Sequence, residues 1–197
     1  MDKVLIGMIL GALLQGAREW WFKRQSIVLD RQYLAVLAVF ALEKLGSECA
    51  EIVFDDGLSQ GQKDKNGCRT AQTSPPTFTP NDLDVEWKAI PVGLMYKIFN
   101  LINEINDSNH HISATIEHEA GPPDYEEFFE ERQLSYAQIG VRAFMVADEL
   151  RKLGALPKRE LRNWDPVESM KSAAERVREE KELRQEQQSK SMEKLGF

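Results

Sequence analysis

The chain opens with an apolar segment that carries no charge. Residues Val4 to Ala17 cover fourteen positions, and Gln15 is their only strongly polar side chain. A bilayer span needs about 20 apolar residues, so this run alone is short. A helix extended to Lys3 and Trp21 would be about 28 Å long, which is close to the roughly 30 Å thickness of a hydrocarbon layer. The pattern therefore predicts an N-terminal membrane helix.

A basic and aromatic segment, residues 18–24, follows this run and is called the collar here. Tryptophan rings are enriched at membrane–water interfaces. Lysine and arginine near the end of a membrane helix extend their charges toward the headgroups. We predict a membrane interface at five residues of the collar: Arg18, Trp20, Trp21, Lys23 and Arg24.

Two other interpretations fit the same segment less well. A cleavable signal peptide needs small residues at its cleavage site, and the best candidate, residues 15–17, has a glutamine at one critical position. A buried soluble helix suits the length of the run, but Gly7, Gly11 and Gly16 would each weaken it. We therefore expect a single-pass anchor over residues 1–24.

The distribution of positive charge predicts how the anchor is oriented. Lys3 and the terminal amine precede the apolar run. Four basic residues follow it: Arg18, Lys23, Arg24 and Arg31. Because positive residues favour the cytoplasmic side, we expect a protein of the bacterial inner membrane with most of its chain in the cytoplasm. Gly7 and Gly11 form a small-xxx-small pattern, which is one route to a homo-oligomer through the membrane helix.

Apolar periodicity predicts a second helix over residues 26–54. Its run from Tyr33 to Leu42 contains ten apolar residues, which is too short for a bilayer span and suits a buried core helix. A second transmembrane pass is the less favoured alternative. No glycine or proline interrupts residues 18–39, so we expect this helix to be nearly continuous with the anchor.

The middle of the chain predicts a long loop followed by a helix. Residues 55–81 are rich in glycine, proline, serine and threonine, as is typical of loops. A helix is expected from Pro91, because proline suits a first helical turn. Residues 106–109 predict a break in that helix, since the side chains of Asn, Asp and Ser compete with helical backbone hydrogen bonds.

The strongest helical periodicity lies in residues 124–153. Spacings of three and four alternate there, which predicts a heptad seam. Its members are Phe129, Arg132, Tyr136, Ile139, Ala143, Val146, Leu150 and Leu153. Gly154 and Pro157 follow as stop signals. The seam is a second route to a homo-oligomer.

The last 40 residues, 158–197, carry ten basic and nine acidic residues. Asp165 precedes Pro166 as a helix cap, and apolar residues are sparse after it. We predict a charged, solvated helix or tail, with a partner-binding helix as the alternative.

The composition excludes several classes of protein and of binding site. Hydrophobic residues make up 42% of the 197 residues, which excludes a wholly disordered chain and a polytopic membrane protein. The net charge of -7 is a poor basis for binding nucleic acid, and we expect none. The two cysteines, Cys49 and Cys68, are too few for a disulfide scaffold or a four-ligand zinc site.

The polar residues form no recognised catalytic or cofactor motif. His111 and His118 are seven positions apart, roughly 10 Å along a helix, which is too far to share one metal ion. Basic residues gather in residues 151–162 and could meet anionic lipid or phosphate, but Glu160 dilutes them. We predict no catalytic, cofactor or metal site.

The layout of residues 1–45 resembles N-terminally anchored, single-pass helical proteins of bacteria and their prophages. This resemblance is one of architecture and implies no activity. We expect an all-α protein in which the anchor (1–24) leads into an antiparallel bundle of about three helices (25–157), followed by the charged segment (158–197). The expected function is interaction or scaffolding, tethered to the lipid bilayer, with an unidentified protein partner.

Two functions of other classes remain as alternatives. One is a phage-encoded accessory membrane protein that acts on the envelope in exclusion or lysis. The other is an enzyme, which would require the 55–81 loop to close over polar groups such as His110, Glu117 and Cys68.

Overall fold

The computed structural model describes residues 2–161 and 163–195, and for residues 2–14, 16, 17, 23 and 192–195 it describes the backbone alone. These residues form four α-helices and no extended strand. The helices are α1 (Asp2–Val53), α2 (Val92–His118), α3 (Glu126–Leu153) and α4 (Pro166–Leu195). Two 3-10 turns, Pro80–Asp82 and Trp87–Ala89, precede α2. The predicted all-α class is confirmed.

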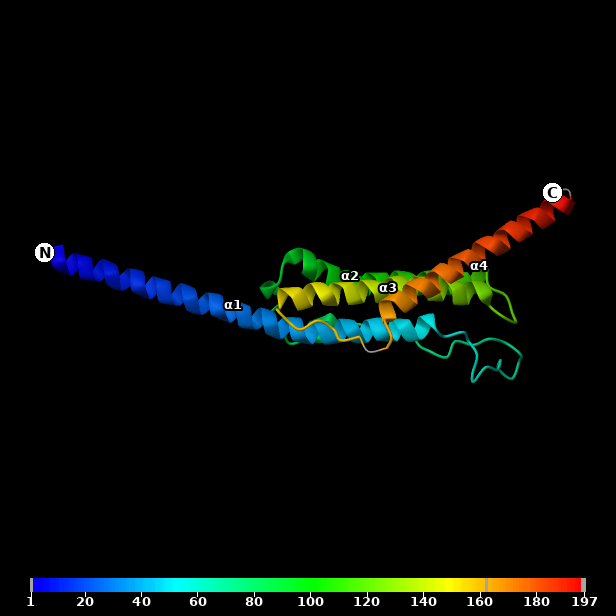
Figure 1. Ribbon diagram of the computed structural model, residues 1–197, viewed down its shortest axis with the longest axis horizontal. Coiled ribbons are helices and arrows are strands. Elements are labelled where there is room, and N and C mark those ends of the chain that lie inside the picture. Colours follow the sequence, from blue (N-terminus) through cyan, green and yellow to red (C-terminus); the bar gives the residue numbers. More distant parts are fainter. Residues whose placement is uncertain (1, 162, 196–197) are drawn as a thin grey trace.

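Helix α1 is a single unbroken helix of 52 residues, so the predicted anchor and second helix are one element. Its C-terminal half lies in the bundle, whereas its N-terminal half extends far beyond it (Figure 1). The boundary lies near Arg31, whose Nε donates a 3.0 Å hydrogen bond to the carbonyl oxygen of Ala89. The first fully buried side chains, Leu34 and Ala35, follow within one turn.

Helix α3 lies at the centre of the bundle and contacts α1, α2 and α4. It runs antiparallel to α1 and α2 (Figure 1). Residues 54–91 return along the length of the bundle before α2 begins, and they bring Ala89 beside the middle of α1. As a result α1 and α2 run in the same direction, so the predicted all-antiparallel order holds only for the pairs that include α3.

The heptad seam of α3 faces the interior of its own chain. Tyr136, Ile139 and Val146 are nearly inaccessible to solvent in the core that α3 forms with α1 and α2, and the equally buried Phe129 lies beside Gly57 and Arg69 of the long loop. The prediction that this seam joins two copies of the chain therefore meets a physical obstacle, because its apolar side chains are already packed.

The predicted break at residues 106–109 is wrong, because α2 continues to His118. The side chains of Asn106 and Asp107 are exposed and reach solvent instead of the helical backbone. Asn109 accepts a 2.6 Å hydrogen bond from the hydroxyl of the buried Tyr136. A tertiary contact thus uses a side chain that would otherwise weaken the helix.

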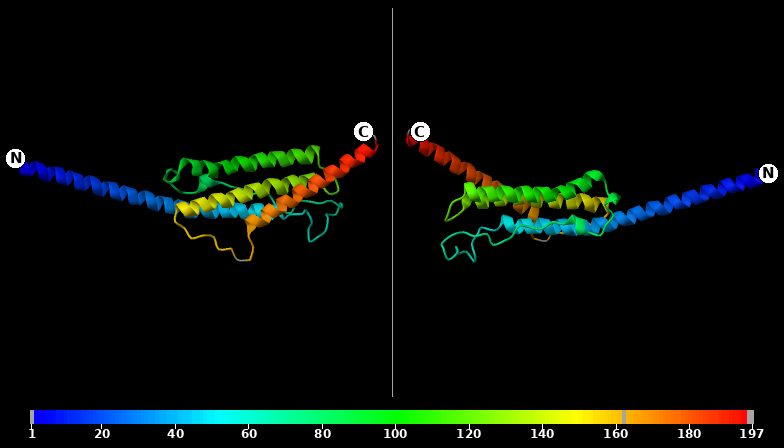
Figure 2. Two further views of the ribbon diagram at one scale, coloured as in Figure 1. Left: turned by 45° about the horizontal axis from the view of Figure 1, so that its top comes forward. Right: turned by 180° about the vertical axis from the view of Figure 1, so that it is seen from behind.

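The predicted end of α3 and the predicted start of α4 are confirmed, whereas α3 begins at Glu126 and not at the expected Asp124. Gly154 ends α3, and Asp165 caps α4 by accepting a 2.9 Å hydrogen bond from the backbone N–H of Val167. The first half of α4 packs on α3 and includes the buried Met170. Arg184 then pairs with Glu126 and Glu130 of α3. Beyond this contact α4 projects from the end of the bundle opposite to the N-terminus (Figure 2).

Candidate functional site

The collar lies on the part of α1 that projects from the bundle. Trp20 and Trp21 are 62% and 61% exposed, and Phe22 is exposed as well. Because successive residues of a helix are turned by about 100°, these three rings cover more than half of the circumference. The bundle does not cover these rings, because it begins near Arg31, about two helical turns beyond the collar.

The arginines of the collar stack on its aromatic rings. The guanidinium carbon of Arg18 lies 5.4 Å from the ring centre of Phe22, and that of Arg24 lies 5.3 Å from the ring centre of Trp20. Both are pairs at i and i+4, which meet on one helix face. The result is an apolar surface with fixed positive charges beside it, a combination suited to an interface between an apolar and an anionic phase.

Three of the site residues predicted in the anchor are described by their backbone alone. The side chain of Lys23 and the surroundings of Gly7 and Gly11 lie outside the described residues. Within the part of the chain that the structure describes, no helix combines the length and the apolar character needed to cross a membrane.

The long loop is attached to the bundle by a buried carboxylate. Asp55 Oδ2 accepts hydrogen bonds from the backbone N–H groups of Gln72 (2.8 Å) and Thr73 (2.9 Å) and from the hydroxyl of Thr73 (2.7 Å). It also pairs with Arg132 Nη1 at 2.8 Å. Oδ1 accepts from the N–H of Gly57 at 3.0 Å. The start of the loop and its residues 72–73 are therefore held at one place on α3.

This network explains why the α3 seam contains an arginine. Burial by itself raises the pKa of Asp55, but hydrogen bonds from Arg132, Thr73 and Gly57 outweigh it and lower the pKa to about 2. The charged pair is thus stable at neutral pH although both side chains are almost fully buried. The lone Arg132 within an apolar seam was a sequence signal for such a partner, although the partner itself, Asp55, is distant in the sequence.

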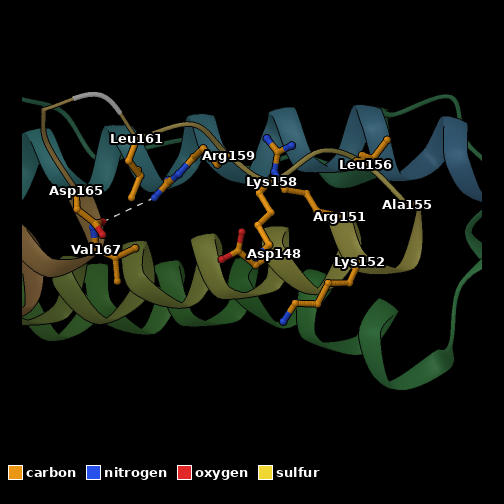
Figure 3. A pocket seen from close by; sticks show the side chains of 10 residues that line it. All are labelled: Asp148, Arg151, Lys152, Ala155, Leu156, Lys158, Arg159, Leu161, Asp165 and Val167. Atoms are coloured by element: carbon orange, nitrogen blue, oxygen red, sulfur yellow. Dashed lines mark hydrogen bonds and ion pairs between the residues drawn. The ribbon is translucent and has the colours of Figure 1, made fainter.

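A second polar region lies where the connection from α3 to α4 crosses α1, and it is called the basic pocket here (Figure 3). Its volume is about 740 Å³. Its polar lining comprises Asp148, Arg151, Lys152, Lys158, Arg159 and Asp165. It contains most of the basic cluster noted in residues 151–162.

The arginines of the basic pocket are already occupied by contacts within the chain. Arg151 binds Glu43 at 2.7 Å and donates to the carbonyl oxygen of Pro157 at 2.8 Å. Arg159 lies 3.8 Å from Asp165 (Figure 3) and stacks on the ring of Phe144 at 4.1 Å. These contacts fix the connection against α1 and α3. Only the exposed Lys152 and Lys158 would have ammonium groups to offer an anion.

The histidines and cysteines considered as metal ligands or reactive groups do not come together into a metal site among the described residues. His110, His111 and His118 are exposed on α2. Cys49 is buried beneath α3, and burial raises the pKa of its thiol to about 12, so it is not a reactive thiolate. Cys68 is a partly buried free thiol in the long loop.

Two features of the molecule were not predicted from the sequence: the Asp55–Arg132 pair, and the exposure of one side of the apolar run from Tyr33 to Leu42. The signal for the second was present, since that run is apolar on every side of a helix. Comparisons with protein-family models, curated proteins and solved structures found no match to this chain.

Proposed function

We propose that this protein is a membrane-tethered helical scaffold, in which the N-terminal half of α1 attaches to a lipid bilayer and the bundle is held away from it for interaction with other proteins. One observation carries the proposal. A single helix of 52 residues connects the uncharged run at residues 4–17 to the core of the bundle, and the collar between them is exposed.

The proposal gives the exposed collar a physical reason. Three large aromatic side chains in water cost free energy that burial at an interface would recover. Trp20 and Trp21 have the amphipathic rings that are enriched at interfaces, and Arg18 and Arg24, which stack on the rings of the collar, would carry positive charge at headgroup depth. The uncharged run that precedes them would then enter the hydrocarbon layer, with Arg18 extended toward the headgroups.

The same geometry would make α1 a spacer of fixed length. The part of the helix between the collar and Arg31 contains no glycine or proline, so it has no residue that favours a kink. The bundle would stand at a defined distance from the membrane. The excess of basic residues after the apolar run favours a bundle on the cytoplasmic side of a bacterial inner membrane.

Flotation of the full-length protein with vesicles of phosphatidylethanolamine and phosphatidylglycerol tests the attachment. The double variant Leu10→Asp/Leu14→Asp places two carboxylates in the apolar run, where each costs about 3 kcal/mol in a bilayer. We expect the wild type to float with the vesicles and the variant to bind at least tenfold more weakly. Met145→Asp/Leu183→Asp, at two exposed apolar positions of α3 and α4, is the matched control and should float normally.

Recovery of the wild-type protein in a high-speed supernatant without detergent would contradict the proposal. A reporter fused after residue 197 tests the orientation separately. Cytoplasmic activity of the reporter supports the scaffold, whereas periplasmic activity supports a protein that acts on the envelope.

A further inference from the structure

The apolar run from Tyr33 to Leu42 is covered on one side only. Leu34, Ala38 and Leu42 are buried against the bundle, whereas Tyr33 is 58% and Phe40 is 68% exposed. A helix that is apolar on all sides is ordinarily buried on all sides. The side of α1 that faces away from α3 therefore has the composition of a packed surface and lacks a partner among the described residues.

This exposed side continues along α1 at heptad spacing. Its large members, called the outer face here, are Phe22, Leu29, Tyr33, Val36 and Phe40. The steps from Leu29 onward are four, three and four residues, and Ser26 occupies the intermediate position between Phe22 and Leu29. Such alternation places side chains in one seam along a helix. The seam is about 27 Å long and crosses the boundary between the projecting half of α1 and the bundle.

The distribution of charged residues along the outer face allows two copies of it to bind each other. No charged residue lies in the seam between Phe22 and Phe40, so a two-fold arrangement places no like charges opposite each other in its interior. Glu19 and Glu43 occupy the next seam positions at the two ends, which limits the seam to this length. The contact would thus be apolar in its middle and charged at its margins, as specific interfaces are.

The area of the outer face is sufficient for a dimer. An aromatic side chain buries about 150–250 Å², and the three aromatic members are each more than half exposed. Together with Leu29 and Val36 they offer about 500 Å² per chain. Two copies would bury about 1,000 Å² in total, which reaches the lower limit for a specific interface.

We propose that a second copy of this chain binds the outer face, so that two α1 helices form a parallel two-stranded coiled coil over residues 22–40. In this arrangement equivalent residues of the two chains meet in successive layers, with Leu29, Tyr33, Val36 and Phe40 in four of them. The parallel direction rests on the proposed function. When two chains are attached to one membrane by their N-terminal halves, their α1 helices run in the same direction.

The mass of the full-length protein in detergent tests the association. Light scattering that separates protein from detergent mass should give twice 22.5 kDa for the wild type. Phe40→Glu buries two facing carboxylates in the coiled coil, so we expect its dissociation constant to rise at least tenfold. Tyr96→Glu on α2, at a residue as exposed as Phe40, should remain dimeric. Ile27→Glu, on another side of α1, should also remain dimeric.

A monomeric wild type at micromolar concentration overturns the inference, as does an equal loss of dimer in Phe40→Glu and Tyr96→Glu. Leu29→Glu provides a second disrupting variant. It lies in the projecting half of α1, where a substitution does not affect the folding of the bundle. It should weaken the dimer like Phe40→Glu.

Cross-linking tests the direction of the two helices. In a Cys68→Ser background, Val36→Cys places one accessible thiol on the outer face, because Cys49 is buried. A short bismaleimide should link position 36 of one chain to position 36 of the other. A dimer without this link overturns the parallel arrangement.

Flotation of the same protein separates the dimer from the membrane attachment. A floating monomer overturns only the dimer, and a dimer that does not float overturns only the membrane attachment.

Discussion

The two halves of α1 belong to one helix but have different surroundings. The C-terminal half buries Leu34, Leu42 and Ile52 against the bundle, whereas the N-terminal half leaves Trp20 and Trp21 in solvent. The difference follows from length. Helix α1 is about 78 Å long, and α3, with 28 residues, is about 42 Å long. The bundle can therefore cover only about half of α1, whatever side chains the other half carries.

A pair of isoleucine variants gives the largest expected contrast between the two halves. Ile52 is 1% exposed and Ile27 is 42% exposed. Ile52→Ala leaves a cavity in the core and should lower the free energy of unfolding by about 2–5 kcal/mol. Ile27→Ala removes little buried surface and should change it by less than about 0.5 kcal/mol. Urea unfolding followed by circular dichroism measures both, and equal effects would contradict the division of the helix.

Acid should release the network of Asp55 and Arg132, called the clamp here, which lies directly after the C-terminal half of α1. The pKa of Asp55 is lowered from its ordinary value of 3.8 to about 2 in the folded protein. Such a carboxyl stabilises the fold above its unfolded pKa, and the stabilisation is lost as the pH falls toward the folded pKa. We expect a loss of about 2 kcal/mol between pH 5 and about pH 2, measured as the pH dependence of the unfolding free energy.

The variant Asp55→Asn controls for other carboxyls. It should be less stable than the wild type at pH 7, because Arg132 then lacks its charged partner. Its stability should fall less steeply with acid. An unchanged pH dependence in this variant would show that the clamp does not titrate as described.

The smallest contrast concerns two helical glycines. A Cβ atom added at Gly46 in the packed half of α1 would lie 2.6 Å from the ring of Phe144, whereas nothing lies within 4 Å of one added at Gly93 in α2. Gly46→Ala should therefore destabilise the protein by about 1–2 kcal/mol. Gly93→Ala should stabilise it by about 0.5–1 kcal/mol, because alanine favours a helix more than glycine does. Thermal unfolding measures both, and a neutral Gly46→Ala would mean that Phe144 moves aside without cost.

Local patterns predicted the helices well because their signals lie within a few residues of each other. The stop at Gly154, the cap at Asp165 and the absence of glycine and proline from residues 18–39 all act through neighbouring backbone groups. The false break at residues 106–109 shows the limit of such reasoning, since the hydroxyl of Tyr136 binds Asn109 from another helix. The collar was identified by its composition, and its contact with a membrane interface stays a prediction.

The sequence alone determined where helices form, because helix propensity, caps and apolar periodicity act over one or two turns. It also determined that α1 carries more apolar surface than one neighbour can cover. Only the tertiary structure decided which neighbours cover each helix and which apolar side chains of α1 stay exposed. Asp55 meets Arg132 because α1 packs on α3, and the outer face of α1 stays exposed because residues 54–91 leave it uncovered; no local pattern specifies the path of such a long connection.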